Sequence, residues 1–383
     1  MSTLDIAIDP CEALRLAYAE ARRQGAGRHR DIAARLGVSE GELVAAHVNP
    51  DLAALPDPAA AAPGLRARRL RGPWPALVAG LESAGPVMAL TRNASCVHEK
   101  TGIYRDCSAQ GPAGREMGLV LGGDIDLRVF YSRWAHGFVV EEAGERGMQR
   151  SLQFFDATGT AVHKVFTRPG TDLRAWAELG HRHVAADQAP GLRPEAPLPP
   201  VSERADAEVD SQAFRRGWAS LRDTHEFFGL LKRHGLARTQ GLRLADPAYA
   251  QPVDNGAARD VLQAAARDAL PVMVFVGNPG MIQIHSGAVQ RVEVMGPWLN
   301  VLDPGFNLHL REDHVAQAWA VRKPTSDGLV SSLELFDATG ETIAMFFGER
   351  KPGRSELCAW RRLVDGLVGA PAWVPQPQGC AAC

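Results

Sequence analysis

The residue types best suited to binding chemistry are histidines and cations spread over both halves of the chain. His225 lies in the stretch 220–234 and His98 in the stretch 92–100. Positive charge comes from Arg128, Arg238, Lys323 and Arg350. Taken singly, such residues are more often solvated or salt-bridged than ligand contacts. Together they favour a flat, apolar ligand with two negative charges. Haem fits, because imidazole can ligate its iron and cations can bind its two propionates.

The stretch around His225 is aromatic and apolar at regular intervals. Steps of three or four residues separate Phe214, Trp218, Leu221, His225, Phe228 and Lys232. This spacing predicts that all six lie along one side of a single helix. A histidine in that stripe has two interpretations: a core imidazole bonded to a backbone carbonyl, or a ligand presented from a rigid helix with aromatic residues such as Phe228 as walls.

The first half of the chain is predicted to begin with helices and to continue with strands. Residues 12–47 are expected to be helical, and residues 31–47 have the spacing of a helix-turn-helix, with Gly37 at the turn and Ser39 as N-cap. The second of these helices carries two acids and no Arg or Asn suited to reading bases. A DNA-binding regulator that uses residues 31–47 therefore stays only as a remote alternative. Period-two alternation from about residue 86 predicts strands through Phe166, and a helix follows over 171–185.

An internal repeat organises the whole chain. Leu-Gln-Phe-Phe-Asp-Ala-Thr-Gly at 152–159 recurs as Leu-Glu-Leu-Phe-Asp-Ala-Thr-Gly at 333–340. A separation of 185 residues, four more than in that match, relates Trp134 to Trp319, Asn93 to Asn278, and Gly102 to Gly287. We infer a tandem duplication of one unit that comprises helices, an antiparallel sheet and a further helix, which is an α+β fold. The expected division is a first repeat over 1–185, a Pro-rich acidic linker over 186–212, a second repeat over 213–370 and a C-terminal tail over 371–383.

Composition and missing motifs exclude several classes of protein. The chain has 383 residues, 45% of them hydrophobic, and a net charge of -2, so nucleic acid is not expected as its main partner. No stretch approaches the length of a membrane span, and we expect no signal peptide and no disulfide framework. P-loop, GxGxxG, HExxH and GxSxG motifs are lacking. These features predict a cytoplasmic protein that is not embedded in a membrane.

Several long stretches resemble one known family. They are Asp-Thr-His-Glu-Phe-Phe-Gly-Leu-Leu-Lys-Arg-His at 223–234, Arg-Asn-(x3)-Val-His-Glu at 92–99, Asp-Leu-Arg-Val-Phe at 126–130, and Arg-Lys-Pro-Thr-Ser-Asp-Gly at 322–328. On these stretches the chain resembles the HemS/ChuS/HmuS-type haemin transport proteins, also called haemin-degrading factors. The resemblance covers nearly the whole chain, including the duplication.

The resemblance implies haem b as the cofactor, held in a cleft between the two copies. It implies that His225 is the axial ligand of the iron and that Arg128 reaches the other haem face, often through water. It matches His98 to a secondary ligand of the first copy, and Arg238, Lys323 and Arg350 to propionate and pocket cations. Phe347 stands where the family carries a tyrosine, and Met345 stands where it carries a glutamine, so the apolar body of the tyrosine is kept and its hydroxyl is lost.

The resemblance leaves the activity open. It implies a cytoplasmic protein of haem-iron acquisition that receives haem from an inner-membrane importer. One alternative is non-classical, haem oxygenase-like degradation with a reductant, in which His225 and Arg128 are the catalytic residues. The other is a non-catalytic chaperone that delivers haem to a separate haem oxygenase. Both alternatives are compatible with one imidazole on one side of the iron and an exchangeable position on the other.

Overall fold

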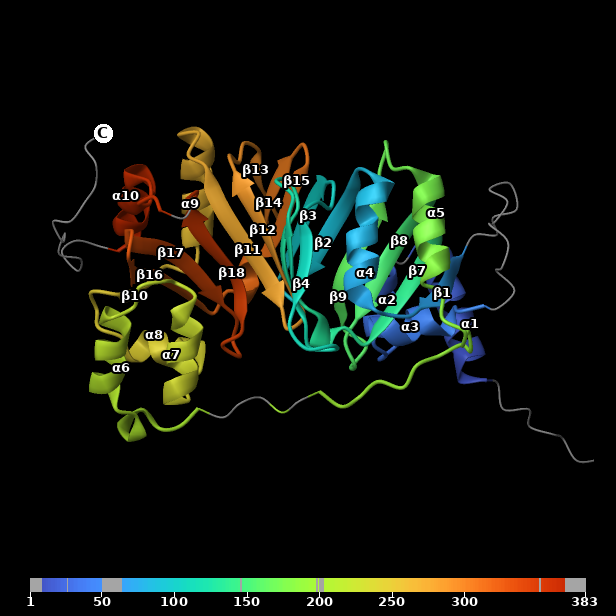
Figure 1. Ribbon diagram of the computed structural model, residues 1–383, viewed down its shortest axis with the longest axis horizontal. Coiled ribbons are helices and arrows are strands. Elements are labelled where there is room, and N and C mark those ends of the chain that lie inside the picture. Colours follow the sequence, from blue (N-terminus) through green and yellow to red (C-terminus); the bar gives the residue numbers. More distant parts are fainter. Residues whose placement is uncertain are drawn as a thin grey trace, which may run out of the picture. The chain divides into compact units, whose positions relative to one another are not determined.

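The chain folds into two compact units, each built from strands and helices (Figure 1). A computed structural model describes residues 9–25, 27–49, 64–144, 147–197, 199, 203–350 and 353–368. Unit 1 comprises residues 1–91, 100–198 and 278–282, and unit 2 comprises residues 92–99, 199–277 and 283–383. The predicted C-terminal tail lies outside the described residues.

Unit 1 combines an antiparallel sheet with five helices among its described residues. Its strands pair in the order β1-β7-β8-β9-β2, and β4, β5 and β6 form a further antiparallel run. The helices are α1 (Pro10–Arg23), α2 (His29–Arg35), α3 (Glu40–Ala46), α4 (Trp74–Gly80) and α5 (Leu173–Arg182). The strands are β1 (Leu65–Leu70), β2 (Val87–Arg92), β4 (Cys107–Gln110), β5 (Met117–Leu121), β6 (Asp126–Phe130), β7 (His136–Gly144), β8 (Gly147–Phe155) and β9 (Ala161–Thr167).

Unit 2 repeats this pattern. Its strands pair in the order β10-β16-β17-β18-β11, and β13, β14 and β15 form the second run. The helices are α6 (Ser211–Ala219), α7 (Glu226–His234), α8 (Arg238–Leu244), α9 (Ala257–Arg267) and α10 (Cys358–Leu367). The strands are β10 (Ala250–Val253), β11 (Val272–Asn278), β13 (Val292–Met295), β14 (Trp298–Asp303), β15 (Phe306–Arg311), β16 (Gln317–Thr325), β17 (Gly328–Phe336) and β18 (Thr342–Gly348). Two further strands are β3 (Cys96–Gly102) and β12 (Met281–Gly287). The predicted α+β duplication with antiparallel sheets is confirmed.

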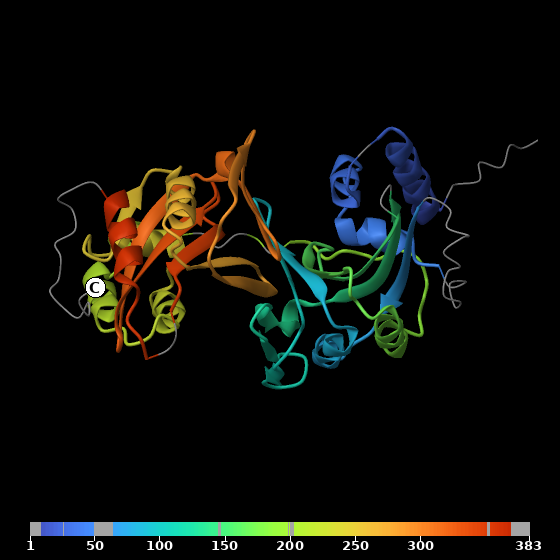
Figure 2. The ribbon, with the colours of Figure 1, turned by 90° about the horizontal axis from the view of Figure 1, so that it is seen from above.

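Helices cover both faces of each main sheet because successive side chains of a strand point to opposite sides. In β7, Phe138 and Val140 pack with α1 to α3, whereas Val139 packs with α4 and α5. Figure 2 shows the blue helices α1 to α3 on one side of the unit 1 sheet and α5 on the other. In β16, Val321 likewise packs with α6 to α8, and Ala320 packs with α9 and α10.

The structure corrects one match of the repeat. The turns η3 (Tyr131–Arg133) and η5 (Glu312–His314) correspond, as do the strands β7 and β16 that follow them. Trp134 comes directly after η3, whereas Trp319 lies inside β16 opposite Glu334. The two tryptophans are therefore not equivalent, because the spacing between the copies shortens from 185 to 181 residues ahead of these elements.

The predicted single aromatic helix was also wrong. Helix α6 ends at Ala219 and α7 begins at Glu226, so His225 precedes α7 instead of lying within a helix. Side chains accept hydrogen bonds from backbone N–H groups of the intervening loop. Asp223 accepts from the N–H of His225 at 2.8 Å. Glu226 accepts from the N–H of Arg222 at 2.9 Å. Such local bonds compete with helix formation and end the regular spacing.

The predicted helix-turn-helix is present as α2 and α3, but it does not offer a recognition surface. Gly37 has φ +71° at the turn, and Ser39 caps α3 through a reciprocal bond pair with Glu42, as expected from the sequence. Six of the seven α3 residues are buried, and Gly41 donates its N–H to the carbonyl of Gly159 at 2.9 Å. A helix packed in this way cannot enter a DNA groove without leaving the unit.

Candidate ligand-binding site

Two cations and one carboxylate gather on the α6–α8 face of the unit 2 sheet. Lys323 from β16 places its Nζ 2.6 Å from Oε1 of Glu334 on the adjacent strand β17. Arg238, the first residue of α8, donates from Nε to Oε2 of Glu334 at 2.8 Å. Ser332, two residues before Glu334 on the same strand, donates to Oε1 at 3.1 Å. Both carboxylate oxygens are thus engaged, and a net single positive charge remains on the three ionic groups.

Burial makes this cluster electrostatically strong. Glu334 is 0% exposed and Lys323 is 3% exposed. Burial disfavours ionisation of Glu334, but the charges of Arg238 and Lys323 outweigh it and hold the pKa of that carboxyl well below its usual range. For Lys323, burial lowers the pKa of the ammonium, and the charge of Glu334 opposes this effect. Glu334 and Lys323 therefore each favour the charged form of the other.

Apolar side chains surround the cations. The ring of Phe227 lies 5.2 Å from Cζ of Arg238 and 4.8 Å from Nζ of Lys323, within the range of cation–π attraction. Met345 on β18 accepts from Nη2 of Arg238 through its sulfur at 3.3 Å. Phe347, two residues on, packs edge to face against Phe275 at 5.0 Å and is half-buried. The arrangement combines apolar walls with fixed positive charge.

His225 presents an accessible imidazole two residues before Phe227, whose ring contacts both cations. Its side chain is 89% exposed, and Nδ1 lies 2.6 Å from Oδ1 of Asp223. Because a carboxylate accepts hydrogen bonds, this contact favours the tautomer with the proton on Nδ1 and the lone pair on Nε2. The backbone N–H of His225 holds the pKa of the Asp223 carboxyl below its ordinary value, so the acceptor stays ionised. This tautomer is the one in which an imidazole can ligate a metal through Nε2.

Arg350 and Phe228 are two further candidate residues of unit 2. Nη2 of Arg350 lies 4.0 Å from Oδ2 of Asp327, and the charge of Arg350 also lowers the pKa of Asp223. Phe228 follows Phe227 on α7 and is 73% exposed. An aromatic ring with this exposure is available to cover a flat apolar ligand.

Arg128 and His98 are found in different surroundings from these residues. Arg128 lies in unit 1 on β6, where it forms an ion pair with Asp126 and donates to the Leu127 carbonyl at 3.2 Å. His98 is grouped with unit 2 and is fully buried. Its Nδ1 lies 2.8 Å from Nε2 of Gln283, and its ring packs 5.0 Å from Phe306. These contacts are those of a core histidine, and the part of His98 in ligand binding stays a prediction.

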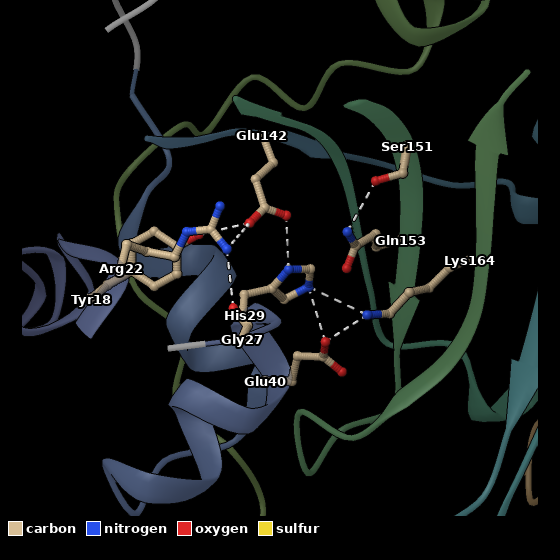
Figure 3. Close-up of polar contacts among 9 residues, drawn as sticks. All are labelled: Tyr18, Arg22, Gly27, His29, Glu40, Glu142, Ser151, Gln153 and Lys164. Atoms are coloured by element: carbon tan, nitrogen blue, oxygen red, sulfur yellow. Dashed lines mark hydrogen bonds and ion pairs between the residues drawn. The ribbon is translucent and has the colours of Figure 1, made fainter. Parts of the chain in front are cut away.

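Unit 1 carries a second buried ionic cluster, drawn in Figure 3. His29 from α2 lies between two carboxylates, with Nε2 2.9 Å from Glu40 and Nδ1 3.3 Å from Glu142. Lys164 from β9 contacts the same oxygen of Glu40 at 2.5 Å. Burial and Lys164 oppose protonation of His29, but its hydrogen bonds to Glu142 and Glu40 raise the pKa of the imidazole overall. Tyr18 donates to Glu142 at 3.0 Å and completes the cluster.

The donor set of the site fits haem better than a bare metal ion. Among the described residues, no group of three or more His, Cys, Asp or Glu side chains is placed to hold a metal. A single exposed imidazole suits an iron whose other positions are filled by a macrocycle, and nearby cations suit its carboxylates.

Sequence reasoning missed Asp223 and Glu334. Asp223 stands two residues before His225 in the quoted stretch, a spacing that permits a local Asx-type bond. Glu334 interrupts the otherwise apolar strand 333–336, which is a detectable sign of a paired buried charge.

The chain is similar to one family model and to several known proteins. The family model described as the haemin-degrading HemS.ChuX domain matches residues 37–183 and 235–367. The hemin transport protein HmuS of Yersinia pestis is 38% identical over 358 residues, which cover 92% of this chain and 96% of HmuS. The crystal structure of holo-PhuS, a heme-binding protein from Pseudomonas aeruginosa, superposes with a TM-score of 0.86 at 46% identity, covering 94% of this chain and 99% of PhuS. The heme degrading enzyme ChuS of Escherichia coli O157:H7 gives a TM-score of 0.82 at 37% identity, covering 93% of this chain and 98% of ChuS.

Proposed function

The chain belongs to the haemin-degrading HemS.ChuX family, and from this premise we propose that it binds haem b in haem-iron acquisition. His225 would ligate the iron through Nε2, and Arg238 would bind a propionate, with Lys323 and Arg350 adding positive charge. Phe228 and Phe347 would contact the macrocycle. Arg128 and His98 keep the roles expected from the family resemblance. Arg128 would reach the other haem face, and His98 would be a secondary ligand. The observation that carries the proposal is the exposed imidazole of His225, whose Nδ1 is held by Asp223 at 2.6 Å.

The proposed setting is the cytoplasm, where the protein would receive imported haem. No helix among the described residues is long and apolar enough to cross a membrane. The partners that this role requires are an importer that supplies haem and either a reductant or a separate haem oxygenase. Bound haem would supply the redox and oxygen chemistry, while the chain orients it and shields its apolar faces.

The proposal for His225 is tested by substitution. We expect His225→Ala to weaken haem binding at least tenfold and to shift or abolish the normal Soret band, because the iron loses its protein ligand. His181→Ala is the matched control, since His181 is an exposed helical histidine of unit 1. Titrations followed by absorbance compare both variants with the wild type. An unchanged Soret band and affinity in His225→Ala would remove His225 as the ligand.

Degradation and transfer are separated by a spectral time course. The haem-loaded protein is given a mild reductant in air, with catalase present to remove free peroxide. Loss of the Soret band with a tetrapyrrole product and free iron identifies an enzyme that opens the ring. A stable spectrum favours the carrier, and transfer to a haem oxygenase is then measured directly.

A further inference from the structure

The two copies carry ionic clusters of opposite polarity at matched positions. Helices α3 and α8 each follow a glycine with positive φ, Gly37 at +71° and Gly235 at +61°. Counting from these glycines, Glu40 of α3 corresponds to Arg238 of α8. Counting along β7 and β16, Glu142 corresponds to Lys323. Two acids of the first copy are therefore replaced by two cations in the second.

The residues that hold these charges differ accordingly. In the first copy, Lys164 and His29 neutralise the acids, and the strand position that matches Glu334 is Gln153. In the second copy, Met345 replaces Lys164 and Phe227 replaces His29. A buried acid thus occurs at this strand position only in the copy in which Arg238 and Lys323 stand in place of Glu40 and Glu142.

We propose that Glu334 is a positioning residue that fixes Arg238 and Lys323 for binding the carboxylates of the ligand. This inference rests on the proposed haem-binding function and deepens it. Glu334 gives one oxygen to each cation and receives the hydroxyl of Ser332, so its own orientation is fixed. Because Lys323 is buried, loss of its anionic partner would favour the neutral amine. Without Glu334, one cation would lose its charge and the other its orientation.

Arg238 keeps binding capacity for a ligand. Only its Nε is directed to Glu334, and Nη2 donates to the sulfur of Met345 at 3.3 Å. A thioether is a weak acceptor, so a carboxylate would be a stronger partner for the same N–H group. The side chain of Arg238 is partly exposed, whereas that of Lys323 is buried. We therefore assign direct carboxylate contact to Arg238 and a supporting charge to Lys323.

The test compares two porphyrins that differ only in their carboxylates. Affinities for haem and for haem dimethyl ester are measured for the wild type and for Glu334→Gln. The wild type is expected to prefer haem, and the variant is expected to reduce that preference by about tenfold, because charge-assisted hydrogen bonds to the carboxylates are lost. The Soret band of the ester complex is expected to stay unchanged, since His225 is untouched. An unchanged or increased preference for haem would overturn the role of Glu334.

Further variants separate positioning from general destabilisation. Glu40→Gln removes the matched buried carboxylate of the first copy, so it is expected to lower stability without changing the preference for haem. In an Arg238→Gln background, Glu334→Gln is expected to add little, because the two residues act as one unit.

If Glu334→Gln does not fold, Ser332→Ala removes one hydrogen bond from the same carboxylate and is expected to reduce the preference for haem in the same direction. An additive effect of Glu334→Gln in the Arg238→Gln background, or an unchanged preference in Ser332→Ala, counts against the proposal. Failure of the wild type to bind either porphyrin would instead contradict the proposed function.

Discussion

Asp223 determines which ring nitrogen His225 would offer to iron in the proposed function. Its carboxylate accepts from both the ring Nδ1 and the backbone N–H of His225. The same side chain therefore sets the tautomer and the position of the imidazole at the start of α7. Partners of this kind raise the basicity of a ligating imidazole and commonly change metal affinity by about 10–100-fold.

At the residue scale, we expect Asp223→Asn to weaken haem binding by about tenfold and to raise the reduction potential of the bound iron. The amide can still accept from the backbone N–H of His225, but it is a weaker partner for Nδ1. Spectroelectrochemical titration of the loaded protein measures both effects.

Asp210→Asn is the matched control, because Asp210 caps α6 by accepting from the N–H of Ala213 at 2.8 Å, whereas His225 precedes a different helix, α7. A potential and affinity equal to those of the wild type in Asp223→Asn would contradict this role.

The sequence could indicate His225 but not its surroundings. Residue spacing indicated an imidazole among aromatic side chains, and this part of the prediction depends only on residues that are close together in the sequence. The bond from Asp223 depends on a loop that interrupts the helix, and the bonds to Glu334 join two strands and the start of α8. Pairing of that kind follows from tertiary packing, which a periodic pattern does not contain.

At the element scale, the interruption between α6 and α7 shows the limit of counting periods. Phe214, Trp218 and Leu221 are buried as the stripe predicts. Phe228 is exposed, because the loop restarts the helical phase at Glu226. Regular spacing across the break therefore matches the buried side of α6, but it does not place Phe228 of α7 on the same side.

The cap of α3 gives a prediction for this scale. Ser39 accepts from the N–H of Glu42 at 3.2 Å, and Glu42 accepts from the N–H of Ser39 at 2.8 Å. We expect Ser39→Ala to lower the free energy of unfolding by about 1 kcal/mol, because the N–H of Glu42 at the helix start loses its acceptor. Denaturant titration monitored by circular dichroism measures the change.

Ser83→Ala serves for comparison, since the exposed hydroxyl of Ser83 only donates to the Gly80 carbonyl. A loss in Ser39→Ala no larger than that in Ser83→Ala would show that the cap contributes little.

At the scale of the whole molecule, buried carboxylates couple stability to acid. The pKa values of Glu40 and Glu334 are held far below the usual value, since ion pairing outweighs the effect of burial in both. The unfolded chain protonates such groups near pH 4.3, whereas the folded chain does not. Their contribution is therefore present above about pH 4.3 and is lost as the pH falls toward their folded values.

We accordingly expect the free energy of unfolding to begin to fall below about pH 5 and to fall most steeply below about pH 4.3. The fall should be shallower in Glu40→Gln and in Glu334→Gln, because each variant lacks one of the groups that take up protons on unfolding. Urea titrations at several pH values provide the measurement, with Glu12→Gln on the exposed side of α1 as the comparison. Equal slopes in all four proteins would exclude the two carboxylates as the cause.

His29 contributes in the opposite sense. Its folded pKa is raised above the ordinary value, so its stabilising effect is complete below about pH 6.5 and is lost as the pH rises through the folded pKa.

The duplication was the feature of the molecule most accessible to sequence reasoning. Repeated turns such as 156–159 and 337–340 need no tertiary information to be matched. The match between Trp134 and Trp319 was wrong because a residue type alone does not fix its place in an element. Insertions in the connecting loops change the spacing while the strands retain their order.

The reversed polarity of the two clusters has an evolutionary consequence. After a gene duplicates, each copy must keep its backbone if the fold is to survive, but the charges on one sheet face can change by single substitutions. In this chain, Glu40 and Glu142 have diverged from Arg238 and Lys323 while the surrounding helices and strands have kept their order. One copy can therefore specialise in an anionic ligand while the other retains the architecture under a different selection.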